Sequence, residues 1–275
     1  LAKKVIIADQ LGVTVDKIFA SNPLEIPLPI AWLGAIAYTF QIYFDFSGYT
    51  DMAIGLGKMF GITLPENFNY PYISKSVSEF WRRWHITLSN WFRDYVFYPL
   101  EFKRRRQKEW RQETNTLIVF FLTGLWHGAS LTFIVWGLWH GLLIAAETFL
   151  SNHKKTLRVP AWLSHLSAML AVVIGWVIFR GENFSFIGRY LGVMFGILRP
   201  VRGAIPMEWI LSPKLFVLLL MALIFSLPVR TCILKALNQS VLIAKVKSIG
   251  YLALFLMTIV FVLSSSYHSF LYFKF

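Results

Sequence analysis

Long apolar runs, each ended by a charged or hydroxyl residue, dominate the hydrophobic and polar pattern of this chain. A helix needs about 20 apolar residues to cross the roughly 30 Å hydrocarbon core of a bilayer, and several runs approach that length. No segment alternates with the period of two that a half-buried strand would show. The pattern therefore predicts an all-α, polytopic integral membrane protein with roughly six helices. The predicted helices cover residues 26–44, 116–150 (enough for two), 162–179, 215–229 and 249–263, with a further short one at 52–61.

Two interruptions in these runs carry residues that a membrane helix does not need. Asp45 and Asp51 stand on either side of residues 47–49, where we predict a break between two apolar segments. These carboxylates either line a path for substrate or cap a helix, and both interpretations stay open. The second interruption, at residues 124–128, predicts the bend of a helical hairpin because it contains two glycines.

The segment that follows Pro71 differs in composition from the apolar runs and begins with hydroxyl residues at 74–78 that can cap a helix. Aromatic and apolar residues then recur at spacings of one, three and four, with arginines between them. We predict an amphipathic helix that lies at the membrane interface or enters the membrane only where protein surrounds it. Its apolar positions are Phe80, Trp81, Trp84, Leu88, Trp91, Phe92 and Tyr95.

The composition strengthens the membrane assignment and gives it an orientation. Hydrophobic residues make up 56% of the 275 residues and charged residues 15%, with a formal net charge of +13. A chain this apolar does not carry its cations on a soluble surface, which argues against nucleic-acid binding. Basic clusters at 103–111 and 154–158 bracket the predicted hairpin, so the positive-inside rule places both in the cytoplasm. Arg189, Arg199 and Arg202 fall on the outer side and depart from this rule.

Three of the six histidines lie inside apolar, aromatic sequence: His85, His127 and His140. Ionisable residues at membrane depth are costly and indicate function, although a buried histidine can also serve only to join helices. We therefore predict that these three belong to a functional site. The other three are expected at surfaces, because they lie in a loop or near helix ends: His153, His165 and His268.

Two kinds of chemistry can use these histidines. A metal site would take the three imidazoles with Asp94 or Glu147, but no pair shows the short helical spacing typical of zinc ligands. No metal is therefore predicted. A neutral imidazole in an apolar pocket can instead accept a proton from a hydroxyl group, which makes general-base chemistry the better fit. The lone Cys232 offers neither a disulfide nor a thiolate cluster.

Four long strings of this sequence resemble one protein family. They are YFDFSGYTDMAIGLG at 43–57, ENFNYPY at 66–72, EFWRRWHITLSNWFRDYVFYPL at 79–100 and GLWHGAS at 124–130. Together they resemble the membrane-bound O-acyltransferase (MBOAT) family, in the bacterial branch of alginate O-acetyltransferase-type proteins. The resemblance implies one transmembrane domain over residues 1–275. Because members carry further N-terminal spans and the chain starts at Leu1, we expect a fragment of a longer protein.

The resemblance also implies an enzyme, with roles for particular residues. The essential histidine of the family falls on His127, expected as general base, and its second position falls on His85, expected to orient a reactant or stabilise an oxyanion. His140 repeats the string Gly-Leu-Trp-His-Gly and is expected to be structural, with a tunnel role as the alternative. Other candidates for the tunnel are Asp45, Asp51 and Trp126.

The implied reaction moves an acyl group, by expectation acetyl, to a hydroxyl of an extracytoplasmic polysaccharide such as alginate. The donor is expected to be a cytoplasmic thioester, acetyl-coenzyme A or an acyl carrier, with no bound cofactor. Expected partners are lipids, the polysaccharide and extracytoplasmic acetylation proteins, in a bacterial inner membrane. Two alternatives are D-alanyl transfer to teichoic acid and a non-enzymatic role in polysaccharide export. A basic cluster is expected to contact the donor or anionic lipids: Lys103, Arg104, Arg105 and Arg106.

Overall fold

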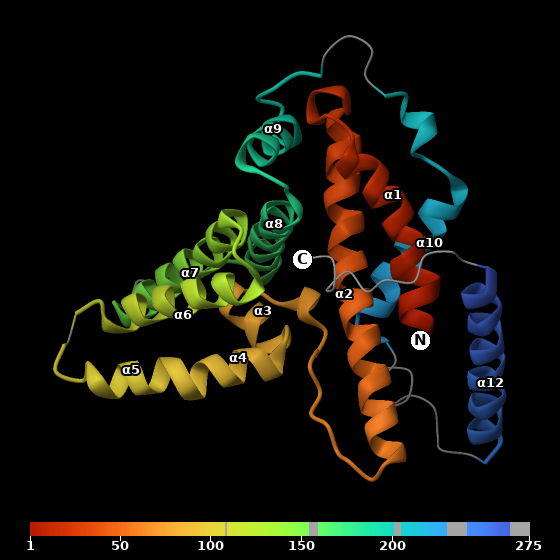
Figure 1. Ribbon diagram of the computed structural model, residues 1–275, viewed down its shortest axis with the longest axis horizontal. Helices are drawn as coiled ribbons and strands as arrows, with labels where there is room; N and C mark the ends of the chain where they lie inside the picture. Colours follow the sequence, from red (N-terminus) through yellow and green to blue (C-terminus); the bar gives the residue numbers. More distant parts are fainter. Residues whose placement is uncertain (108, 154–158, 201–204, 230–240, 265–275) are drawn as a thin grey trace. The chain divides into compact units, whose positions relative to one another are not determined.

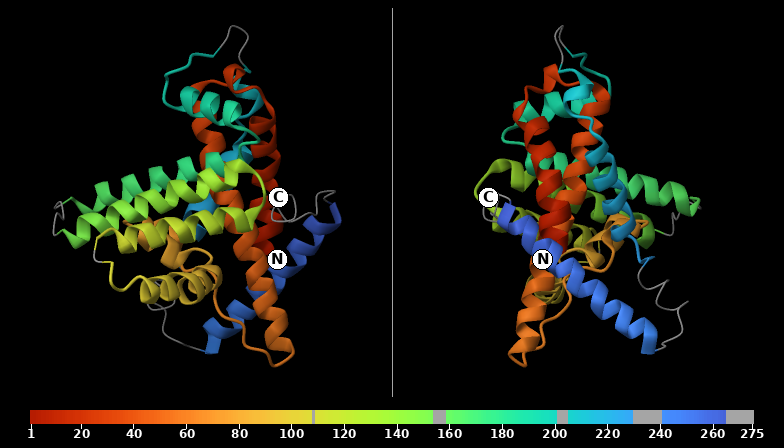
Figure 2. Two further views of the ribbon diagram at one scale, coloured as in Figure 1. Left: turned by 60° about the vertical axis from the view of Figure 1, so that its left-hand side comes forward. Right: turned by 90° about the vertical axis from the view of Figure 1, so that its right-hand side faces the viewer.

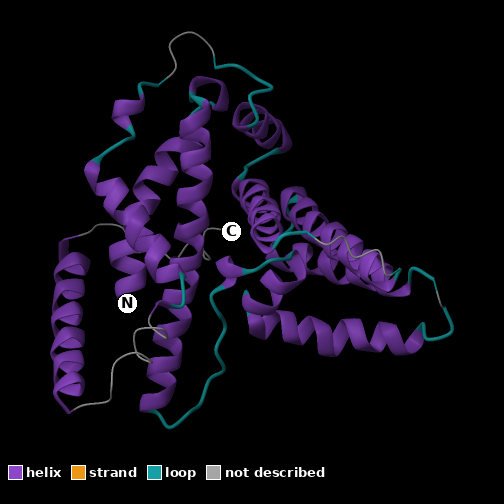
Figure 3. Ribbon diagram, turned by 180° about the vertical axis from the view of Figure 1, so that it is seen from behind, coloured by secondary structure: helices purple, strands orange, loops and turns teal. Residues whose placement is uncertain are grey.

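The computed structural model describes residues 1–107, 109–153, 159–200, 205–229 and 241–264. Helices are the only regular elements in these ranges, as Figure 3 shows by colour, so the all-α prediction is confirmed for them. Several residues used above lie outside the described part: Lys108, Lys154, Lys155, Arg158, Arg202, Cys232 and His268.

The chain divides into two compact units, residues 1–21, 25–65 and 202–275 in the first and residues 22–24 and 66–201 in the second. The helices of the first unit are η1 (Lys3–Ala8), α1 (Asp9–Ala20), α2 (Leu28–Met59), η5 (Met207–Trp209), α10 (Pro213–Ser226) and α12 (Val241–Ser264), with η2 (Pro23–Glu25) where the chain passes between units (Figure 1). Those of the second unit are η3 (Pro71–Ile73), α3 (Val77–Arg83), α4 (Ile86–Phe92), η4 (Arg93–Phe97), α5 (Tyr98–Lys103), α6 (Arg111–His127), α7 (Leu131–Asn152), α8 (Ala161–Arg180) and α9 (Phe184–Met194).

The first unit is built on the pairing of α1 with α2. Leu11, Val15 and Ile18 of α1 are spaced by four and three residues, so they share one face, and none of them is accessible to solvent. Ala31 and Ala35 of α2 are equally buried, and their small side chains let two helices approach closely. The helical period of the sequence is therefore sufficient to account for this contact.

The predicted break at residues 47–49 is wrong, because α2 runs without interruption from Leu28 to Met59. Asp45 does not end the helix, since its carboxylate is buried against the ammonium group of Lys4 at 2.6 Å. The same ammonium group lies 2.6 Å from Asp9. A buried carboxylate that has an opposite charge within contact distance need not turn to water, so the helix can continue through it.

The second unit contains a closely packed hairpin of α6 and α7, which Figure 2 shows side by side in both views. The two copies of Gly-Leu-Trp-His-Gly lie on opposite arms, and their first glycines meet. A Cβ atom on Gly137 would lie 3.2 Å from Cα of Gly124 and would overlap the carbonyl oxygen of Phe120. The first glycine of each repeated string therefore serves packing, since residues without a side chain allow the two backbones to touch.

Two helices in the described part are long and apolar enough to cross a membrane, and both belong to the second unit. They are α7 and α8, with 22 and 20 residues. Two further apolar segments are shorter, residues 213–226 and 248–264. The predicted spans at 116–150 and 162–179 thus correspond to helices, whereas the larger number of crossings stays a prediction.

The amphipathic segment is not one helix, which corrects the sequence prediction. It is divided into α3 and α4 at Trp84 and His85, where His85 adopts the left-handed conformation with φ 43°. From Ile86 the helix then continues through η4 and α5 to Lys103. This run exposes aromatic side chains at spacings of four, three and four, as an interfacial helix would. They are Trp91, Tyr95, Tyr98 and Phe102.

Candidate active site

The structure brings two of the predicted histidines, His85 and His127, together at the indole ring of Trp126, which is itself a predicted site residue. The ring of Trp126 lies 5.0 Å from the ring of His127 and 6.0 Å from the ring of His85, with edge-on geometry in both cases. Trp126 is half exposed, whereas His85 is 9% exposed. Residues 42 positions apart in the sequence therefore form one local cluster within the second unit.

The end of α6 and several contacting aromatic rings fix the position of His127. It is the last residue of the helix, and Gly128 follows with φ 145°, a conformation that suits glycine. Trp136 lies 4.9 Å from the imidazole and Phe179 5.3 Å from it, both edge-on. A half-buried imidazole at a helix end, held by rings on several sides, has little rotational freedom and still reaches the surface.

His85 is placed by its strained backbone and by Asn67. A left-handed residue other than glycine costs roughly 1–2 kcal/mol, so surrounding bonds must hold it. Nδ1 of His85 lies 3.2 Å from Oδ1 of Asn67, and the backbone N–H of Ile86 donates to the carbonyl oxygen of Asn67 at 3.0 Å. Burial, together with the nearby His127, lowers the pKa of His85 to about 3, so its imidazole is neutral near pH 7.

His140 lies deeper in the same unit and is fully buried. Its Nδ1 lies 3.1 Å from the carbonyl oxygen of Trp136, one turn earlier on α7, and the ring of Trp136 also contacts His127. A Cβ atom on Gly175 of α8 would lie 2.9 Å from Nε2 of His140. His140 therefore fills the contact between α7 and α8, and its tunnel role stays a prediction.

The basic cluster at the end of α5 is partly used for internal bonds. Arg104 donates to Oδ1 of Asn115 at 3.0 Å, and Arg111 donates to Oε2 of Glu101 at 2.8 Å. The remaining cations are exposed: Lys103, Arg105 and Arg106. Asn115 lies twelve residues before His127 on α6, or about 18 Å along the helix at 1.5 Å per residue.

Asp45 and Asp51 belong to the first unit and are both paired with lysines. Asp45 is bonded to Lys4 inside the unit, as described above, and the more exposed Asp51 lies 2.8 Å from Lys3. The tunnel role of these carboxylates stays a prediction. Within the described ranges, no three His, Cys, Asp or Glu side chains come together as ligands for a metal ion.

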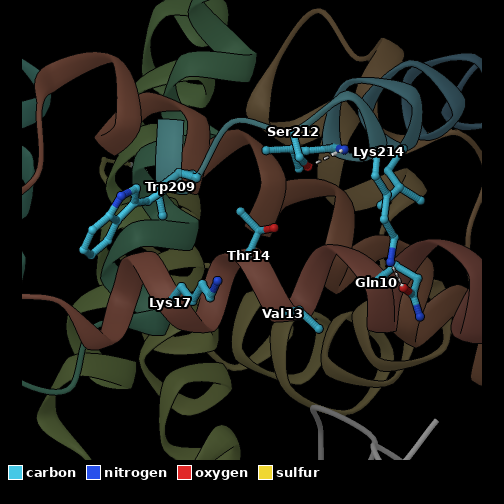
Figure 4. Close-up of a pocket in the computed structure, with 10 residues that line it drawn as sticks. Gln10, Val13, Thr14, Lys17, Trp209, Ser212 and Lys214 are labelled. Atoms are coloured by element: carbon cyan, nitrogen blue, oxygen red, sulfur yellow. Dashed lines mark hydrogen bonds between the residues drawn. The ribbon is translucent and has the colours of Figure 1, made fainter. Parts of the chain in front are cut away.

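A separate cavity in the first unit contains none of the predicted site residues. It lies between α1 and the segment from η5 to the start of α10, as Figure 4 shows. Lys17, Lys214 and Trp209 line it, and the ammonium group of Lys214 donates to Oε1 of Gln10 at 2.6 Å. The cavity is therefore basic and open, with one of its two cations already bonded within the unit.

The sequence pattern does not reveal the bonds of three residues near the cluster. Asn67 lies inside one of the quoted strings, but its setting in the sequence indicates no role. For Glu147 the sequence suggests only a metal ligand, whereas its carboxylate accepts hydrogen bonds from the first backbone N–H groups of α3. His165, predicted at a surface, is half-buried, and its Nδ1 lies 2.9 Å from the carbonyl oxygen of Ser74.

The cluster has the components for proton transfer at a hydroxyl group: two imidazoles, one held neutral by burial, next to a partly exposed indole. The comparison with known families assigns the chain that carries it to a family. The model of the membrane-bound O-acyltransferase family matches residues 7–188. The chain belongs to this family. The match covers both histidines of the cluster and all of α3 to α8.

Relatives within the family carry names that refer to several acceptors. The "Probable alginate O-acetylase AlgI" of Pseudomonas syringae pv. tomato is 50% identical over 196 residues, which are 70% of this chain and 36% of the relative. The peptidoglycan O-acetyltransferase of Helicobacter pylori is 38% identical over 199 residues, 72% of this chain and 37% of the relative. The teichoic acid D-alanyltransferase of Bacillus subtilis is 38% identical over 162 residues, 54% and 40%. This chain thus spans less than half the length of the relatives it matches.

Proposed function

We propose that this protein is a multi-pass O-acyltransferase of the bacterial inner membrane that transfers an acetyl group from a cytoplasmic thioester to a hydroxyl of an extracytoplasmic polysaccharide such as alginate. The observation that carries the proposal is the grouping of His85 and His127 around Trp126 in a chain of this family. Identity of about half the aligned residues to alginate O-acetylases favours acetyl as the acyl group. Teichoic acid D-alanyltransferases are less similar, so D-alanyl transfer is the second candidate.

In this mechanism His127 accepts the proton of the acceptor hydroxyl as its oxygen attacks the thioester carbonyl. The tetrahedral intermediate then collapses with loss of the thiolate, which takes the proton from His127. His85, beside the same indole, orients a reactant. Every proton is thereby returned, and His127 is neutral again for the next cycle.

The exposed cations at the end of α5 are suited to the anionic part of the donor. Coenzyme A and acyl carriers both place the thioester on a long flexible arm, away from negative charge. The separation of about 18 Å between Asn115 and His127 along α6 is compatible with such an arm. Acidic lipids would meet the same cations at a cytoplasmic surface, and additional proteins outside the membrane would complete the modification of the polymer.

Replacing His127 with Ala or Gln in the natural protein tests this function. We expect loss of acyl transfer in isolated membranes while the protein still accumulates there, with His153→Ala as the control because His153 is exposed. Release of free thiol from acetyl-coenzyme A, measured with acyl groups on the polymer, separates an acyltransferase from an export component. Near-normal acylation by the His127 variants would refute the assignment.

A further inference from the structure

The segment that carries Asn67 is fixed beside His85 by backbone bonds. The N–H of Asn69 donates to the carbonyl oxygen of Arg83 at 2.9 Å, and the N–H of Ile86 donates to that of Asn67 at 3.0 Å. The first bond is made by Arg83, just before His85 in the sequence, and the second by Ile86, just after it. Because both involve only main-chain atoms, they persist when the side chain of Asn67 is changed.

The hydrogen bonds of Asn67 show which atom of its amide group, oxygen or nitrogen, faces His85. That atom in turn determines the tautomer of the His85 imidazole. The backbone N–H of Thr87 donates to Oδ1 at 3.1 Å, and the Thr87 hydroxyl donates to the same atom at 2.9 Å. A backbone N–H can only donate, so the atom it meets is the oxygen and not the nitrogen of the amide. Nδ1 of His85, 3.2 Å from that oxygen, must then carry the hydrogen.

A neutral imidazole has only one N–H, so Nε2 of His85 carries a lone pair. Such an atom accepts a hydrogen bond from a hydroxyl group and repels the negative oxygen of a tetrahedral intermediate. The geometry of Asn67 thus separates the two roles that the sequence left open for His85. Of the two, it favours binding a reactant over stabilising an oxyanion.

We propose that Asn67 is a positioning residue that holds His85 in the Nδ1–H tautomer, so that Nε2 of His85 accepts a hydrogen bond from a hydroxyl group of the acceptor. This inference rests on the proposed acyl transfer. A sugar ring carries neighbouring hydroxyl groups, so the imidazoles beside Trp126 can each bind one, His127 the group that is acylated and His85 the next. Since His85 is buried, side chains must move to admit the acceptor, and the half-exposed Trp126 is in ring contact with it.

Two variants test the tautomer, with transfer from acetyl-coenzyme A to alginate oligosaccharide measured over a range of pH in membranes that contain the natural protein. Asn67→Ala removes the acceptor oxygen, and we expect kcat to fall about 10- to 100-fold with the KM for the donor unchanged. Asn67→Asp keeps an acceptor oxygen and adds a negative charge. We expect its kcat above neutral pH to stay within about threefold of wild type, because the tautomer is retained.

The acidic limb of the pH–rate profile provides a readout that a purely structural role would not change. Protonation of either imidazole stops the reaction, so the limb follows whichever of His85 and His127 is protonated at the higher pH. A carboxylate beside Nδ1 favours the imidazolium form of His85, so in Asn67→Asp we expect His85 to set the limb, which should move to higher pH by about one unit or more. His127 is the titratable side chain whose charge acts on His85, and it is unchanged in both variants. Thr87→Val, which removes one hydroxyl donor to Asn67 and leaves the backbone donor, is the matched control and should keep the wild-type limb.

Wild-type kcat in Asn67→Ala would overturn the inference. So would an unmoved acidic limb in Asn67→Asp, which decides the matter alone if the alanine variant does not fold. The His127→Ala variant distinguishes this failure from failure of the proposed function. If His127→Ala abolishes transfer while both Asn67 variants behave as wild type, only the role of Asn67 is wrong.

Discussion

Replacing Glu147 with glutamine tests how α3, which leads directly to His85, is held against α7. The carboxylate of Glu147 accepts the backbone N–H of Val77 at 2.7 Å and that of Ser78 at 2.9 Å, together with the Ser78 hydroxyl. These are among the first N–H groups of α3, which have no partner inside the helix. One side chain of α7 thus fixes the start of a helix about 70 residues earlier in the sequence.

The expected cost follows from the bonds that the amide cannot make. The two N–H groups meet different oxygens of the carboxylate, Val77 at Oε1 and Ser78 at Oε2, so in glutamine the NH₂ group would face one of these two N–H donors. Losing one hydrogen bond to a charged acceptor costs about 2 kcal/mol, within the 1.5–3 kcal/mol that such bonds contribute. For a chain of this size that corresponds to a decrease in Tm of roughly 4–8 °C.

Thermal unfolding in detergent, followed by loss of the monodisperse protein, measures this decrease. Glu79→Gln is the matched control, because Glu79 accepts the N–H of Lys75 at the start of the same helix without any bond to α7. Glu79 also forms an ion pair with Arg83 one turn later on α3. We expect less than half the effect for this variant, since both affected interactions are local and an i,i+4 ion pair contributes little. Wild-type Tm in Glu147→Gln, or an equal decrease in Glu79→Gln, would refute the reasoning.

Two further predictions concern packing and pH. Gly137→Ala should lower the free energy of unfolding by about 1–3 kcal/mol, because the added methyl group meets the backbone of α6. The control is Gly188→Ala on α9, where a Cβ atom meets nothing within 4 Å, and we expect it to be neutral or slightly stabilising. Equal Tm values for the two variants would contradict this account. Because the pKa of His85 is lowered in the folded protein, the imidazole is protonated at higher pH in the unfolded chain than in the folded one. Acidification below about pH 6.5 therefore favours the unfolded chain, and His85 alone lowers the free energy of unfolding by about 2 kcal/mol at about pH 5. Wild type should therefore lose more Tm than His85→Gln between about pH 8 and pH 5, and equal losses would show that His85 does not contribute.

The sequence predicts most of the helices because their apolar residues recur with the helical period, as at Leu11, Val15 and Ile18. It fails where one side chain far along the chain changes a local preference. Asp45 looks like a helix end until Lys4 is found beside it, and the continuous pattern from Phe80 to Tyr95 gives no sign that His85 is left-handed. Both outcomes depend on tertiary contacts, which periodicity does not contain.

The same limit applies to the candidate site. His85 and His127 are found from their unusual setting in apolar sequence and Trp126 from the family resemblance, and the structure places the three in one cluster. Asn67 and Glu147 act through hydrogen bonds to residues 18 and about 70 positions away. A polar residue that serves as a partner at such a distance looks, in the sequence alone, like any residue of a loop or a helix surface.

The strings that meet at Gly124 and Gly137 are identical in sequence but differ in backbone structure. The two copies of Gly-Leu-Trp-His-Gly share every letter, yet the backbone ends a helix at the first and continues through the second. His127 is consequently left at an accessible turn, whereas His140 is enclosed between two helices. The two histidines have the same sequence neighbours, although the first is partly accessible and the second is fully buried. In this protein the accessibility of the histidine depends on whether the helix ends after the five-residue string, and not on the residues of the string itself.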